Sequence, residues 1–98
     1  MSLRGGRLVR LVGANSKGLI ESKWCRNRGF PFLVIDPEPD PAPGARDAEE
    51  RTLRFSRVPV GSLRALMEGG EMLMPSIVTL DLGLRWLRRE GLLPPEEL

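Results

Sequence analysis

Phe30-Pro31-Phe32-Leu33-Val34-Ile35 is the most hydrophobic run of the chain. Aromatic and β-branched residues dominate it, and such residues are enriched in β-strands. Pro31 lies near the start of the run, where a missing backbone N–H costs a strand little. The run therefore predicts a buried strand, and the segments on either side of it indicate the kind of fold that this strand joins.

Three segments before this run carry strand or turn signals. Arg7-Leu8-Val9-Arg10-Leu11-Val12 ends at a glycine and predicts a strand of about five or six residues. Leu19–Arg26 mixes polar and apolar residues, with Ile20 and Trp24 on one possible strand face. Asn27–Gly29 predicts a tight reversal, because Asn and Gly tolerate positive φ.

Residues 36–50 follow the hydrophobic run as an acidic, proline-rich loop. Prolines alternate with other residues from Asp36 to Gly44, which removes hydrogen-bond donors and excludes regular structure there. From Arg51 to Val58 apolar and polar residues alternate, which predicts a half-buried strand.

Two helices are expected after these strands. The first covers Val60 to Glu68 and is stopped by Gly69-Gly70. The second begins at Pro75, a favoured first helical position, and ends at Gly91. Residues 92–98 form a C-terminal tail. Strands first and helices last predict an α+β fold, with three to four strands followed by two C-terminal helices.

Length and composition exclude several classes of protein. The 98 residues suit one domain, and no histidine is present, which leaves a zinc site almost no ligands and removes every Ser-His-Asp or Cys-His mechanism. The single Cys25 excludes an internal disulfide. No apolar run approaches the roughly 20 residues of a membrane span, and no signal peptide is evident. We therefore expect a cytoplasmic protein without a membrane partner.

Charge is distributed unevenly along the chain. Residues 1–30 carry seven basic groups against Glu21 alone, a net of +6, whereas residues 31–50 carry six acids against one arginine, a net of −5. This separation indicates either an anionic partner or an intramolecular complement. The solvated faces of a small domain would explain it equally well.

The order of these segments resembles a known family. A strand is followed by a Ser-x-Gly loop, a hydrophobic strand, an acidic proline-rich loop, a strand that ends in Val-Pro-Val, a helix before Gly-Glu, and a leucine-rich helix. The segments are Arg7–Val12, Ser16–Glu21, Phe30–Ile35, Asp36–Glu50, Arg51–Val60, Gly70-Glu71 and Ser76–Leu87. This order is similar to the C-terminal half of Nudix hydrolases, closest to their ADP-ribose pyrophosphatase branch. The resemblance implies that residues 1–98 form one partial Nudix-like domain, part of an α/β/α sandwich.

The defining element of that family is missing. The Nudix box has an Arg-Glu-x-x-Glu-Glu core whose carboxylates bind magnesium or manganese. No such core is present, since Arg89-Glu90 and Glu96-Glu97 are too far apart and prolines interrupt any helix between them. We therefore expect no hydrolysis and no cofactor for this chain alone, with Mg or Mn required only if a Nudix box completes it. A missing N-terminal half, or self-association as a homodimer, would complete the sheet.

Glu49 and Glu50 are the candidate catalytic residues that the resemblance implies. They lie in the loop from which this branch supplies a glutamate to orient or deprotonate the attacking water. An ordinary solvated acidic loop is the alternative interpretation. No metal ligands are assigned.

Two basic segments are candidate substrate-binding or phosphate-binding sites. Ser16, Lys17 and Gly18 could bring backbone amides and an ammonium to a phosphate, although a plain turn explains them too. Lys23, Arg26 and Arg28 surround one stackable ring, Trp24, as in sites for phosphates or single-stranded nucleic acid. The alternative there is a solvated hairpin in which Trp24 is a lid on the core.

A second function follows from these cations. The chain could be a small basic module that binds nucleic acid or an acidic protein. Its contacts would come from Arg4, Arg7, Arg10, Lys23, Arg26 and Arg28.

Overall fold

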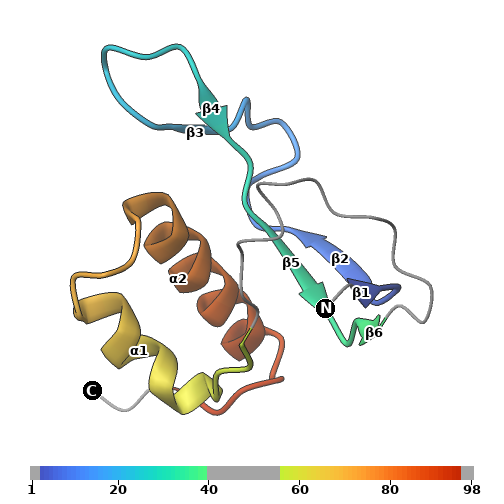
Figure 1. The fold of residues 1–98 in the computed structure, drawn as a ribbon. Helices are drawn as coiled ribbons and strands as arrows, with labels where there is room; N and C mark the ends of the chain where they lie inside the picture. Colours follow the sequence, from blue (N-terminus) through green and yellow to red (C-terminus); the bar gives the residue numbers. More distant parts are fainter. Residues whose placement is uncertain (1–2, 40–55, 96–98) are drawn as a thin grey trace.

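The computed structural model describes residues 3–39 and 56–95. Their elements are β1 (Leu3–Arg4), β2 (Arg7–Arg10), β3 (Leu19–Ile20), β4 (Arg28–Gly29), β5 (Phe32–Ile35), β6 (Glu38–Pro39), α1 (Val60–Glu68) and α2 (Met74–Arg89). The strands form three antiparallel pairs, β1 with β6, β2 with β5 and β3 with β4 (Figure 1). Short antiparallel strands followed by two helices confirm the α+β class, and the strands are shorter and more numerous than the sequence predicts.

The β2–β5 pair is the longest of the three. Arg7 lies opposite Ile35 and Arg10 lies opposite Phe32, and the backbone N–H of Leu11 continues the ladder by donating to the Pro31 carbonyl at 3.1 Å. Because side chains alternate across a strand, the pair has two different faces. Val9, at 8% exposure, lies on the face toward α2, and Leu8, at 66% exposure, lies on the outer face.

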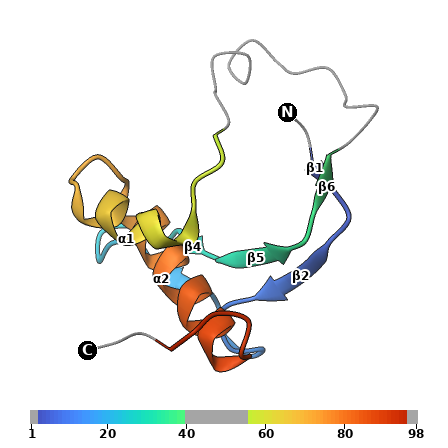
Figure 2. The same cartoon turned by 90° about the horizontal axis from the view of Figure 1, so that it is seen from below.

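Helix α2 packs against β5 beside this pair of strands (Figure 2). Gly83 is buried, and a Cβ atom at this position would lie 3.8 Å from Cδ1 of both Leu11 and Leu33. Leu84 beside it is 9% exposed, and the Arg7 guanidinium lies 5.2 Å from the Trp86 ring. A methyl group at Gly83 would therefore meet both Leu11 and Leu33 at ordinary contact distance, and the helix approaches the sheet here through these two side chains.

Both helices lie where the sequence predicts them. The bounds of α1 agree with the prediction, and α2 begins one residue before Pro75, which occupies its first turn. The backbone N–H groups of Leu92 and Leu93 both donate to the Leu87 carbonyl, so the start of the tail folds back on the end of α2. No helix within residues 3–39 and 56–95 has the length and apolar character needed to cross a bilayer.

The predicted reversal at Asn27–Gly29 is wrong. The turn lies instead at Lys23-Trp24, and Arg28-Gly29 is strand β4, paired with β3. Ser22 explains the difference: its hydroxyl accepts from the Trp24 N–H at 3.2 Å and its carbonyl accepts from the Cys25 N–H at 3.2 Å. A serine that bonds its own downstream backbone turns the chain without requiring positive φ. The strand expected over Leu19–Arg26 is therefore limited to β3.

Three further expectations need correction. The run that includes β5 is half-exposed rather than buried, since the outer face of the β2–β5 pair has no covering layer among the described residues. Glu38-Pro39 is not loop but β6, because a two-residue edge pair tolerates a proline without its N–H. Ser56, Arg57 and Val58 form no strand. The rest of the strand expected over Arg51–Val58 lies outside the described residues.

The core is small. Among the described residues, the large apolar side chains of the core are Val9 and Leu84, and both keep a small exposed fraction. Many large apolar side chains are exposed, and they include Leu8, Ile20, Trp24, Phe32, Val34, Leu73 and Met74.

The contact at Gly83 can be tested with one methyl group. Gly83→Ala should raise the free energy of unfolding by about 0.5–1 kcal/mol, because alanine favours the helix and its Cβ fits at ordinary contact distance. Urea denaturation followed by circular dichroism at 222 nm measures this change in the free energy of unfolding. Gly61→Ala in α1, where nothing lies within 4 Å, is the matched control for helix propensity alone. A lower stability for Gly83→Ala with a gain for Gly61→Ala would contradict this packing of α2 on the sheet.

Candidate functional site

The basic part of the chain folds into a hairpin that extends from the β2–β5 pair (Figure 1). In it Leu19 lies opposite Gly29 and Ile20 lies opposite Arg28. Gly18 begins the hairpin with φ +95, and a Cβ atom there would lie 2.9 Å from both Arg28 Cβ and Phe30 Cε2. Only glycine allows this backbone conformation together with so close an approach.

The loop Ser16–Gly18 is held by two arginines from different strands. Arg10 Nη2 donates to the Ser16 carbonyl at 2.8 Å, and Arg28 Nη1 donates to the Gly18 carbonyl at 3.2 Å. The Ser16 and Gly18 N–H groups donate within the turn, to the Gly13 carbonyl and to Ser16 Oγ. The loop therefore gathers cations, with Lys17 exposed beside them. Phosphate binding by these three residues stays a prediction.

Trp24 is not a lid on the core. Its side chain is 86% exposed at the hairpin turn, so that expectation is wrong. Lys23 Nζ lies 4.7 Å from the centroid of the Trp24 ring, a cation–π contact that keeps a positive charge beside the ring. Arg28 is exposed on β4, and Arg26 is exposed in the loop before it. The structure therefore brings Lys23, Arg26 and Arg28 onto one exposed hairpin, with Lys23 beside the accessible Trp24 ring.

A second aromatic ring lies beside a cation at the base of the hairpin. The Arg10 guanidinium lies 5.2 Å from the centroid of the Phe30 ring, which is 45% exposed. Sequence reasoning assigned Phe30 to a buried strand and missed this pair. The sequence carries only a weak signal for this pair, because Arg10 and Phe30 are twenty positions apart and meet only through the pairing of β2 with β5.

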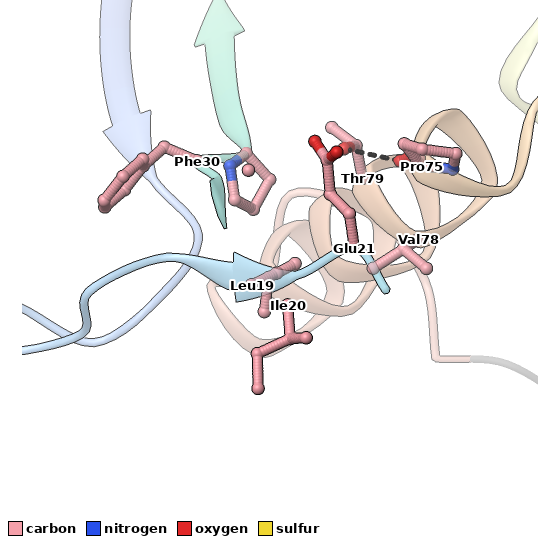
Figure 3. Close-up of a pocket in the computed structure, with 9 residues that line it drawn as sticks. Leu19, Ile20, Glu21, Phe30, Pro75, Val78 and Thr79 are labelled. Atoms are coloured by element: carbon pink, nitrogen blue, oxygen red, sulfur yellow. Dashed lines mark hydrogen bonds between the residues drawn. The ribbon is translucent and has the colours of Figure 1, made fainter. Parts of the chain in front are cut away.

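A hollow of about 460 Å³ separates the hairpin from the first turns of α2 (Figure 3). Leu19, Ile20, Gly29, Phe30 and Pro31 line one side, and Pro75, Val78 and Thr79 line the other, together with Glu21. Glu21 Oε1 lies 3.8 Å from the position that a Cβ atom would take at Gly29. The Thr79 hydroxyl donates to the Pro75 carbonyl at 2.9 Å. Sequence reasoning missed this hollow, because it depends on where α2 lies.

The carboxylate candidates Glu49 and Glu50 lie outside the described residues. Within residues 3–39 and 56–95, no three Cys, Asp or Glu side chains gather closely enough to hold a metal ion. The site that the structure describes is therefore a basic, aromatic hairpin with an adjoining hollow.

Comparison with protein-family models finds no match to this chain. The curated proteins and the solved structures give no match either. The resemblance to Nudix hydrolases therefore depends on the order and chemistry of the segments alone.

The position of the hairpin depends on Gly18. Gly18→Ala should lower the free energy of unfolding by about 1–3 kcal/mol more than Gly5→Ala does, because the new methyl group must displace Arg28 and Phe30. Gly5 also has positive φ but open space around it, so its variant reports backbone strain alone. Chemical denaturation of both variants measures the difference. Equal losses would show that Arg28 and Phe30 do not pack against Gly18.

Proposed function

We propose that this chain binds single-stranded nucleic acid through the hairpin of β3 and β4. The observation that carries the proposal is Trp24, a large ring left in solvent with Lys23 at 4.7 Å. Exposing an indole ring is unfavourable in water, and stacking on a base would remove the ring from water. Proteins that bind single strands combine such stacking rings with cations that follow the phosphates.

The charges around the ring support the same ligand. The described residues 3–39 contain seven basic side chains and three acidic ones, Glu21, Asp36 and Glu38. Arg10 beside Phe30 repeats, at the base of the hairpin, the pairing of cation and ring found at its turn. The two rings could stack on successive bases of one strand, and the cation beside each ring could contact the neighbouring phosphate. A duplex would not offer its base faces to these rings.

Removing the exposed ring tests the proposal. Trp24→Ala should weaken binding of a labelled twelve-nucleotide oligodeoxythymidine by about 1–3 kcal/mol, the usual contribution of one stacked base. Fluorescence anisotropy at fixed salt measures the affinity. Met74→Ala is the matched control, because Met74 is an equally exposed apolar side chain on α2. Trp24→Phe keeps a stacking face and should retain most of the affinity.

The salt dependence of binding completes this test. Lys23→Gln and Arg26→Gln should each reduce the slope of log affinity against log salt by about 0.7, the value for one phosphate contact on a single strand. Binding of poly-glutamate with the affinity of the oligonucleotide, unaffected by Trp24→Ala, would instead identify an acidic protein as the partner and overturn the proposal.

The second candidate function is a Nudix-like fragment or remnant. The order of β2, β5, α1 and α2 along the chain supports it, as does α2 packed on one face of the β2–β5 pair. In this proposal, the half of a Nudix domain that carries the metal-binding box packs on the uncovered outer face of the β2–β5 pair. The described residues offer no set of metal ligands, so no metal-dependent step is assigned to them.

This candidate predicts an inactive chain. Incubation of the chain alone with ADP-ribose and magnesium should release no AMP or ribose 5-phosphate above the protein-free rate, because the box carboxylates are absent. Chromatography of the products measures release. Turnover that scales with the concentration of this chain would contradict the prediction, and loss of that turnover in Glu49→Gln would assign the catalytic role to Glu49.

A further inference from the structure

The hollow beside the hairpin is built from the same strands that carry the exposed rings. Leu19, Ile20 and Glu21 belong to or follow β3, and Gly29, Phe30 and Pro31 belong to or follow β4. A strand that stacks on Trp24 and passes Phe30 therefore runs along the rim of the hollow. One of its bases could turn into the hollow without leaving the hairpin.

The size and lining of the hollow suit a flat ring. Its volume of about 460 Å³ lies in the range of small-molecule sites, roughly 300–1,000 Å³. Leucine, isoleucine, proline and valine side chains supply most of the lining. Two of these side chains, Val78 and Ile20, are exposed to solvent. A planar base between these walls would cover apolar surface on both sides.

The polar side chains that line the hollow present hydrogen-bond acceptors. Glu21 lines the hollow, and its carboxylate oxygens are hydrogen-bond acceptors. The Thr79 hydroxyl gives its proton to the Pro75 carbonyl, so its remaining capacity is also that of an acceptor. A ligand that fits the hollow must therefore have adjacent hydrogen-bond donors along one edge.

We propose that the hollow binds a guanine base of the strand held by the hairpin, with Glu21 accepting from N1–H and the 2-amino group; this inference rests on the proposed function. Guanine presents these two donors side by side. Adenine and cytosine place a ring acceptor beside their amino group, and uracil and thymine place carbonyl oxygens on both sides of their single N–H. A carboxylate therefore favours guanine over the other four bases. The cations of the hairpin hold the phosphates on either side.

Base substitution within one oligonucleotide tests the proposal. An oligodeoxythymidine with one central guanine should bind about tenfold more tightly than the same strand with thymine, adenine or cytosine there, the usual discrimination of a two-bond contact. Hypoxanthine, which lacks the 2-amino group, should lose most of this gain. Glu21→Gln should remove the preference, so that strands with guanine, adenine, cytosine or thymine at the centre bind equally. Glu38→Gln in β6 is the matched control and should keep the preference, because Glu38 does not line the hollow.

A second measurement locates the base. NMR shift changes on addition of the guanine-containing strand, relative to the all-thymine strand, should concentrate at Val78 and Thr79 of α2. Equal affinity for all central bases would overturn the guanine site and leave the proposed function intact. A guanine preference that survives Glu21→Gln, or shift changes absent from α2, would also overturn it. Failure of every oligonucleotide to bind would overturn both proposals together.

Discussion

Four residues of β2 pair with four residues of β5, and the other elements of the described structure are placed by this ladder. At one end the ladder continues through the Leu11–Pro31 hydrogen bond to the hairpin of β3 and β4. At the other end Gly6 lies so close to the Ile35 carbonyl that a Cβ atom would be 2.7 Å away, and the chain passes there to the β1–β6 pair. The inner face of the ladder receives α2. A break in this pairing would separate the hairpin from the helix and remove the hollow between them.

Because the core is small, many apolar and charged side chains lie at the surface. One face of the β2–β5 pair is covered by α2, and the other exposes Leu8 and Val34, which lie opposite each other in the ladder. The same arginines that support the hairpin also charge its surface, since Arg10 and Arg28 each donate to a carbonyl of the Ser16–Gly18 loop. The conformation of this loop and the charge of the surface are therefore coupled, and a substitution of either arginine would change both.

Local sequence signals predicted the helices well and the hairpin poorly. Helix α1 ends before paired glycines and α2 has a proline in its first turn, and these signals act within a few residues of the ends that they set. The turn was assigned to Asn27–Gly29 on the strength of residue types, but Ser22 hydrogen bonds place it at Lys23-Trp24. Side-chain-to-backbone bonds of this kind are hard to rank from sequence, because several turn-forming residues compete within one short segment.

The α+β class, the basic first third of the chain, the lack of histidine and the lack of a Nudix box can all be read from the residues in order. Composition and short-range periodicity express these properties directly. The exposure of Trp24, the position of Arg10 over Phe30 and the hollow that Glu21 shares with α2 become visible only in the folded chain. Each of these features depends on the way distant segments pack together. Residue types cannot reveal a contact whose partners lie many positions away.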